Sequence, residues 1–198
     1  MSQPLSRAEA WSLFCEWTAS PSLRKHVLAV EAAMRAYAPR FGGDEEEWGL
    51  VGMLHDLDYE RHPDMEAEDG HPRTGMAELE RQGFSPEFVR AVASHADFLD
   101  VPRETPMEKA LYAVDELSGF LMACAYVRPQ GIHGLAPKSV KKKMKTPAFA
   151  AAIDRDALRA GAEELGVDFD EHVVTVIAAL EAHSGELELD GAEPQTAA

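Results

Sequence analysis

The stretch Thr105-Pro-Met-Glu-Lys-Ala-Leu-Tyr-Ala-Val-Asp-Glu-Leu-Ser-Gly-Phe-Leu-Met122 carries the clearest helix start in the chain. Thr105 is a good capping residue, proline follows at the first helical position, and Glu108 stands at the third. Apolar side chains then recur every three or four residues, at Leu111, Val114, Leu117, Leu121 and Met122. The pattern predicts a long helix with one buried face.

Similar signals recur on both sides of this stretch. Further helices are predicted to begin at Ser6, Ser20, Asp44 and Ser85, and near residues 72, 154 and 169. No run of alternating β-branched residues and no Asn-Gly or Asp-Gly hairpin signal interrupts them. We therefore predict an all-α fold, a single-domain helical bundle.

Length and composition agree with one domain. The chain has 198 residues, of which 45% are hydrophobic and 27% are charged, enough for a core that needs no disulfide support. We expect the domain to cover residues 1–185, with its functional motifs in residues 20–130. Residues 186–198 are acidic, small and polar, and we expect them to form a disordered tail.

The charge balance excludes some partners. With 35 acidic against 19 basic residues the formal net charge is −16, which disfavours binding to polymeric nucleic acid or to an anionic membrane. The two cysteines, Cys15 and Cys124, form no metal or redox motif and are expected to be small buried thiols. No signal peptide or membrane-spanning stretch is apparent, so a cytoplasmic protein is expected.

Six metal-capable side chains fall on or beside core-facing positions of five predicted helices. They are His26, His55, Asp56, His71, His95 and Asp115. Asp115 is the most informative of the six, because burying a carboxylate on the inward face of a helix costs free energy unless a cation or several hydrogen-bond donors compensate its charge. One such histidine is equally consistent with a hydrogen-bonded core residue, but the six together predict a metal site. Imidazole and carboxylate ligands suit Mn, Fe, Co, Ni, Zn or Mg.

These residues also carry a family resemblance. The supporting motifs are His26, Gly52-Met-Leu-His-Asp-Leu-Asp58, Gly70-His-Pro-Arg-Thr-Gly75, Val92-Ala-Ser-His95 and Ala113-Val-Asp-Glu-Leu117. In this order they resemble the metal-binding signature of the HD-domain superfamily of metal-dependent phosphohydrolases, and in particular its small stand-alone members. The resemblance departs at Ala96 and at Leu57-Asp58-Tyr59, where two-metal phosphodiesterases of the superfamily often have a second histidine and a Gly-Lys pair.

The resemblance implies a helical bundle of the HD-domain type with one or two divalent metal ions at its centre. His26, His55, Asp56 and Asp115 would be the core ligands, and His71 and His95 would hold a second metal. Asp56, His71 and His95 are the expected catalytic residues. The expected function is hydrolysis of a small phosphorylated molecule, most plausibly a nucleotide-like phosphomonoester.

Five of the seven lysines lie between residues 138 and 145. We expect Lys138, Lys141 and Lys142 to bind the substrate phosphate, because a cationic patch would attract anions that the overall charge repels. The alternative for this segment is a solvated helix face. Two alternatives also remain for function: a di-iron oxygenase of the HD type, acting on a small anionic substrate, and a metal-containing binding module without turnover.

Overall fold

Residues 4–191 are described in a computed structural model, and within this range they form helices joined by turns, with no β-strand. The helices are α1 (Arg7–Trp17), α2 (Pro21–Tyr37), η1 (Ala38–Phe41), α3 (Glu45–Leu54), α4 (Arg73–Gln82), α5 (Pro86–Ser94), η2 (Asp97–Leu99), α6 (Pro106–Tyr126), α7 (Pro137–Met144), α8 (Arg155–Leu165) and α9 (Phe169–Glu181). The predicted all-α fold is confirmed. None of these helices is long and apolar enough to cross a lipid bilayer.

Local capping explains where the helices begin. Ser6 and Thr105 each form a complete capping box with the glutamate three residues later. The side chains of Ser20, Asp44 and Ser85 accept hydrogen bonds from backbone amides in the first turn of α2, α3 and α5. The lysine-rich segment forms a helix of its own, α7, whose first residue is proline.

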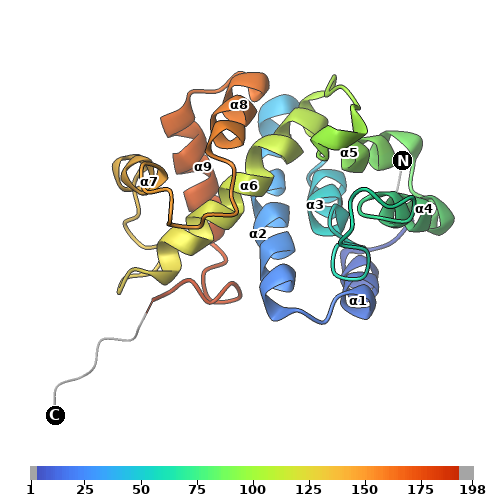
Figure 1. The fold of residues 1–198 in the computed structure, drawn as a ribbon, viewed down its shortest axis with the longest axis horizontal. Helices are drawn as coiled ribbons and strands as arrows, with labels where there is room; N and C mark the ends of the chain where they lie inside the picture. Colours follow the sequence, from blue (N-terminus) through green and yellow to red (C-terminus); the bar gives the residue numbers. More distant parts are fainter. Residues whose placement is uncertain (1–3, 192–198) are drawn as a thin grey trace, which may run out of the picture.

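The central helix is α2, which packs against α3, α6 and α9 (Figure 1). Its predicted apolar face is fully buried, with Val27, Val30, Met34 and Tyr37 inaccessible to solvent. Burying side chains of this size stabilises the fold by roughly 1.5–3 kcal/mol each. The core thus forms around α2 and holds the helices beside it in fixed positions.

A glycine lets α3 approach α2 closely. A methyl group added at Gly52 would lie 3.0 Å from the backbone of Val30 and Glu31 in α2. This contact is tighter than a β-carbon normally tolerates, so the two helices pack nearly backbone to backbone at this point. The approach places His55, at the end of α3, beside His26 of α2, with their ring centroids 5.5 Å apart.

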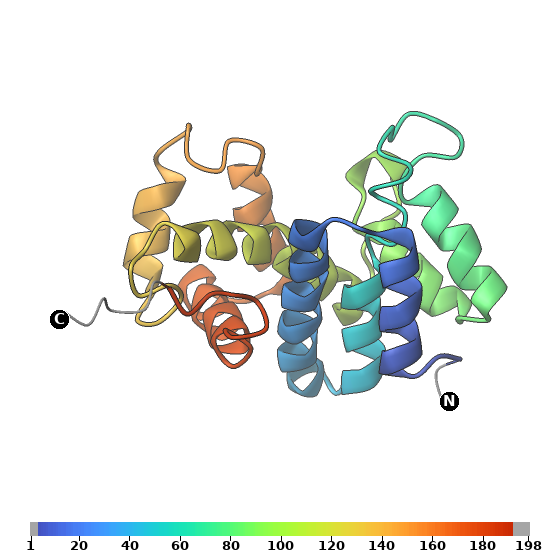
Figure 2. The same cartoon turned by 90° about the horizontal axis from the view of Figure 1, so that it is seen from below.

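The longest helix, α6, runs across the molecule and joins its two ends. It packs against both α5 and α7. Figure 1 shows α5 near the start of α6 and α7 near its end. In both views α4 and α5 lie at one end of the molecule and α7 lies at the other (Figures 1 and 2). Groups on the two halves of α6 therefore belong to different regions of the fold.

The predicted start of the tail, at residue 186, is wrong, because residues 186–191 belong to the folded domain. Within residues 186–191, Leu187 and Leu189 are buried in the core, and the carbonyl of Leu189 accepts a hydrogen bond from the Ile132 amide. Two leucines in an acidic stretch are enough to hold it against the domain. The rest of the predicted tail, 192–198, lies outside the described residues. Both cysteines are free thiols; Cys124 is buried as expected, whereas Cys15 is only partly buried.

Candidate metal centre

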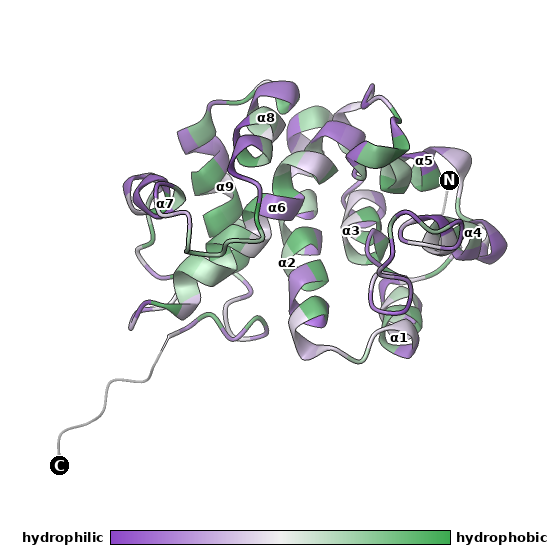
Figure 3. Cartoon of the chain, viewed as in Figure 1, coloured by the Kyte–Doolittle hydropathy of each residue, from purple (hydrophilic) through white to green (hydrophobic). Residues whose placement is uncertain are grey.

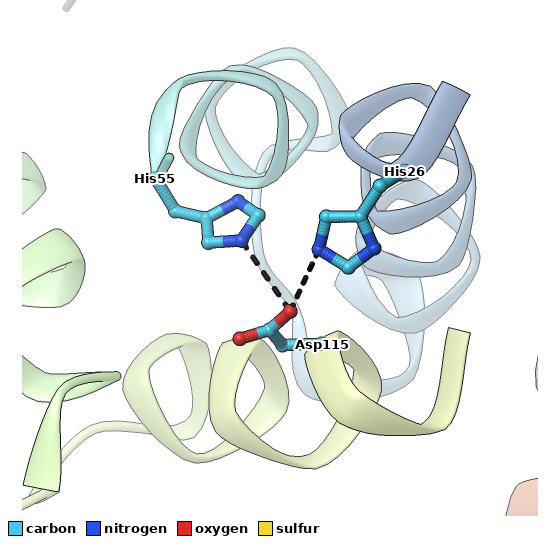
Figure 4. Close-up of side chains that lie close together, drawn as sticks. All are labelled: His26, His55 and Asp115. Atoms are coloured by element: carbon cyan, nitrogen blue, oxygen red, sulfur yellow. Dashed lines mark hydrogen bonds and ion pairs between the residues drawn. The ribbon is translucent and has the colours of Figure 1, made fainter. Parts of the chain in front are cut away.

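Three helices bring the first set of metal-capable side chains together. His26 comes from α2, His55 caps the end of α3, and Asp115 lies in the first half of α6. Both rings point at one carboxylate oxygen (Figure 4): Oδ1 of Asp115 lies 2.9 Å from Nε2 of His26 and 3.4 Å from Nε2 of His55. We call these residues the first triad.

A second triad lies directly beside the first and comprises Asp56, His71 and His95. Asp56 follows His55, His71 precedes α4, and His95 caps the end of α5. Nε2 of His71 lies 3.4 Å from Oδ1 of Asp56 and 3.2 Å from Nε2 of His95. The structure thus brings all six predicted ligands into one place.

The carboxylate of Asp56 lies between the two triads. Its Oδ2 atom is 3.5 Å from Nε2 of His55 and 3.8 Å from Nε2 of His26. Its Oδ1 atom faces the other way, toward His71 and toward Nε2 of His95 at 3.9 Å. Ligand atoms bound at 2.0–2.2 Å to one ion in tetrahedral or octahedral geometry are about 3.0–3.5 Å apart. Most of the observed separations are close to this range.

Two of the histidines are oriented by carbonyls one turn back along their own helices. Nδ1 of His55 donates to the Gly52 carbonyl at 2.8 Å, and Nδ1 of His95 donates to the Val92 carbonyl. A donor at Nδ1 leaves Nε2 as the atom with a free lone pair, which is the form that binds metals. Each ring therefore presents its ligating nitrogen to the centre.

His71 is oriented by Asp58, a residue that the sequence analysis did not assign to the site. Asp58 is fully buried and accepts hydrogen bonds from Nδ1 of His71 and from the Gly75 amide, both at 2.7 Å. Burial opposes ionisation of Asp58, but these hydrogen bonds outweigh it and lower its pKa. No local spacing signals this contact, because Asp58 and His71 are 13 residues apart and meet only where the segment between α3 and α4 folds back.

Two observations show that the residues fit metal ions. Nε2 of His55 is buried and makes no hydrogen bond, although carboxylate oxygens of Asp115 and Asp56 lie 3.4 and 3.5 Å away, and a metal ion between these atoms would satisfy all of them. Nε2 of His71 and of His95 face each other at 3.2 Å, an arrangement that a shared cation reconciles. The charges agree: burial lowers the pKa of His55, but Asp56 and Asp115 outweigh it and raise this pKa to about 9, so without metal a proton occupies Nε2, the place that a metal ion would take.

Comparison with known protein families gives a match to the HD domain over residues 23–119. The chain carries an HD domain. All six residues of the two triads lie within the match, which ends in α6. HD domains are generally metal-dependent hydrolases, so the family and the geometry agree on a metal centre. The predicted recognition is confirmed for this part of the chain.

A curated protein also resembles part of the chain. Ribonuclease Y of Oleidesulfovibrio alaskensis (strain ATCC BAA-1058 / DSM 17464 / G20) is 28% identical over 100 residues, which is 50% of this chain and 18% of that protein. The chain thus spans less than a fifth of the length of this relative. No solved structure matches the chain significantly.

The centre of the HD domain opens into a pocket of about 540 Å³. Its acidic lining residues are Asp56, Asp97, Asp115, Glu116 and Asp154, and none of the described residues lining it is a lysine or an arginine. Burial and the neighbouring charge of Asp115 raise the pKa of Glu116 to about 7. Arg103 pairs with the lining residue Asp97 at 2.7 Å from outside the lining, so metal ions or protonated histidine are the candidates for cationic charge inside the pocket.

The predicted phosphate-binding lysines are not at this pocket, which corrects the sequence analysis. Lys138 is exposed on α7, Lys141 pairs with Asp170 of α9 at 2.7 Å, and Lys142 lines a different hollow. The physical reason is the length of α6, because α7 packs near its far end. The local charge pattern of the lysine segment does not indicate how far α6 separates this segment from the metal centre.

Proposed function

We propose that the chain is a metal-dependent hydrolase of a small phosphorylated substrate, a nucleotide-like phosphomonoester. The main support for this proposal is the position of the Asp56 carboxylate, whose two oxygens face two separate histidine pairs. A carboxylate in this position suits two metal ions about 3.5–4 Å apart, the arrangement used by many phosphoester hydrolases. Divalent ions held by the triads would supply Lewis acidity toward phosphoryl oxygens and lower the pKa of a coordinated water.

The protein's own residues would orient the reaction. Asp56 lies between the histidine pairs, where its carboxylate would hold the metal ions and could accept a hydrogen bond from an attacking water. Glu116 lines the same pocket beside Asp115, where its carboxylate can take up or release a proton during the reaction. His71 stays oriented through its hydrogen bond to Asp58.

The wall of the pocket supports a nucleotide-like substrate. Tyr59, Met65 and Phe98 line it and remain exposed, by 40%, 38% and 45% respectively. Exposed aromatic surface beside a reactive centre is suited to stacking on a planar base. Asp154, on the same lining, could accept hydrogen bonds from amino or hydroxyl groups of such a substrate.

The partial relative is named as a ribonuclease, which raises a phosphodiester substrate as an alternative. The formal charge of −16 and the acidic pocket lining disfavour a long polyanion. A small phosphomonoester whose charge is met by bound metal is more consistent with this pocket. We infer that the partner of the centre is a small molecule rather than a nucleic-acid polymer.

The experiment is a phosphate-release assay on metal-depleted protein reloaded with Mn²⁺, Co²⁺, Ni²⁺ or Zn²⁺ under strict anaerobiosis. The panel contains nucleoside monophosphates, simple phosphomonoesters and matched phosphodiesters. We expect the protein to cleave phosphomonoesters and the Asp56→Ala variant to be inactive. The control variant is Asp69→Asn, which changes an exposed carboxylate outside both triads and should leave cleavage unchanged. Cleavage of the diesters alone would overturn the monoester assignment.

A di-iron oxygenase is the second candidate, favoured by the four histidines and two aspartates that meet without any cysteine. The same assay distinguishes it once a further arm is added, in which the metal-depleted protein is reloaded with Fe²⁺ and assayed in the presence of dioxygen. Turnover that appears only with iron and dioxygen, and never with Zn²⁺ in the absence of oxygen, would replace the hydrolase proposal with the oxygenase.

A further inference from the structure

A second hollow, of about 460 Å³, lies beside the C-terminal end of α6. It is lined by three cationic side chains, Arg128, Lys142 and Lys143, and none of the described residues lining it is acidic. The metal pocket shows the opposite pattern, with acidic residues and without lysine or arginine. In a chain with a net charge of −16, a hollow whose charged lining residues are all positive needs an explanation.

The helix α7 forms one wall of this cationic pocket. Ser139, Lys142 and Lys143 are spaced so that they share one face of the helix. Val140 and Met144 are buried on another face and anchor α7 to the core. The hydrophilic character of the remaining surface of α7 is visible at one end of the molecule (Figure 3). The wall is therefore part of the packed fold.

Two of the three cations are held near the hollow by contacts of their own. Arg128, just after α6, donates to the carbonyl of His133 at 2.8 Å. The Lys143 ammonium lies 4.5 Å from the centre of the Phe149 ring, within cation–π range. Neither cation is paired with a carboxylate among residues 4–191.

The other polar groups remain free to bind a ligand. Within the described residues, the Lys142 ammonium and the hydroxyls of Ser139 and Thr146 make no hydrogen bond or ion pair. Lys141, on a neighbouring face of α7, differs because it pairs with Asp170 at 2.7 Å. Unpaired donors thus gather on the face that lines the hollow.

We propose that this cationic pocket binds a small phosphorylated anion at a site separate from the metal centre. Several positive charges around one hollow repel each other, and an anion in the hollow would relieve that repulsion. Lysine, arginine and hydroxyl donors together are suited to phosphate oxygens. The volume falls within the usual range of about 300–1,000 Å³ for small-molecule sites. Its concave shape and the acidity of the whole chain favour a small ligand over a nucleic acid.

The two pockets are distinct. They share no lining residue, and Cys124, which lines the cationic pocket, is nine positions after Asp115 in α6. At the helical rise this is ~13.5 Å along the axis. Binding at the cationic pocket therefore does not depend on the function proposed for the metal centre.

The test is a calorimetric titration of the full-length, metal-loaded protein with inorganic pyrophosphate, using two matched double variants. Lys142→Gln with Lys143→Gln removes two charges from the pocket. Lys138→Gln with Lys145→Gln removes two exposed charges from the same short segment, outside the pocket lining. Binding of pyrophosphate at the metals is common to all three proteins and cancels in the comparison.

We expect the pocket variant to weaken saturable pyrophosphate binding by about tenfold or more, since two charge-assisted contacts are lost. The control variant should change it by no more than about twofold, because Lys138 and Lys145 are exposed and lie outside the pocket lining, so solvent and salt screen their charge from the bound anion. Lys142→Arg with Lys143→Arg should retain binding, and the single variant Lys142→Gln serves if the double variant does not fold.

Equal losses in both double variants would overturn the proposal and leave only diffuse surface charge. The absence of saturable binding that depends on Lys142 and Lys143 would also overturn it, and would leave these cations to stabilise the ends of α6 and α7. A single-stranded RNA oligonucleotide that binds through the same lysines more tightly than pyrophosphate, at equal salt, would replace the small anion with a nucleic acid.

Discussion

Asp56 is the residue on which both triads depend, because each of its carboxylate oxygens faces a different pair of histidines. His71, in contrast, belongs only to the second triad. We therefore expect Asp56→Ala to bring bound metal close to zero per chain, while His71→Ala retains the metal of the first triad. Elemental analysis of protein purified without chelators measures this. Equal loss in both variants would contradict the shared role of Asp56, and Asp97→Asn, on the pocket lining outside both triads, is the control.

Asp58 acts through His71 and does not face the metals itself. Its hydrogen bond fixes which nitrogen of His71 carries the proton, and such partners commonly change metal affinity by about 10–100-fold. Asp58→Asn should therefore weaken binding of the second metal while leaving the first in place. Metal titration followed by competition with a chelator gives the two affinities. Unchanged affinity for the second metal would assign Asp58 a purely structural role through the Gly75 amide.

At the scale of the elements, His172 ties three helices together. It lies in α9, its Nδ1 accepts a hydrogen bond from the Tyr37 hydroxyl of α2 at 2.6 Å, and its Nε2 donates to the Ala113 carbonyl of α6 at 3.0 Å. Burial lowers its pKa to about 4, and the charge of Arg40 acts in the same direction. The ring is neutral in the folded protein and holds α6, with Asp115 on it, against the core.

This lowered pKa makes stability depend on pH. Above about pH 6.5 His172 is neutral in both the folded and the unfolded state. Between pH 6.5 and 4 the unfolded chain binds a proton that the folded chain excludes, so the folded state loses stability as the pH is lowered. The stability advantage of the natural chain over His172→Gln should shrink by about 2 kcal/mol between pH 7 and pH 5. Chemical denaturation at several pH values measures it. A constant difference would contradict the predicted titration of His172.

Across the whole molecule, the metal centre joins α2, α3, α5 and α6, so bound metal should stabilise the entire fold. A ligand at about 100 times its dissociation constant contributes roughly 2.7 kcal/mol. For a domain of this size, chelation should then lower Tm by about 5–10 °C. Differential scanning calorimetry with and without EDTA measures the change. Asp56→Ala should show no such shift, and a shift in that variant would mean that the chelator acts elsewhere.

How much of the fold was predictable depends on the range of the forces involved. Helix starts such as Thr105 and Ser85 were predicted because a cap satisfies backbone amides within one turn. The buried stripe of α2 was predicted because burial repeats with the helical period. The end of the domain was misplaced, since Leu187 and Leu189 are buried by contacts with distant parts of the chain.

The sequence by itself determined the helices, the six metal-capable residues and their family, because these depend on residue type, order and local spacing. Only the tertiary structure decided that Asp56 lies between two triads, that Asp58 orients His71, and that the lysines lie away from the metal centre. The physical reason is that side-chain direction at helix ends, and the distance that α6 places between its halves, come from packing. Packing joins residues that are far apart in the chain, and no local pattern encodes where they meet.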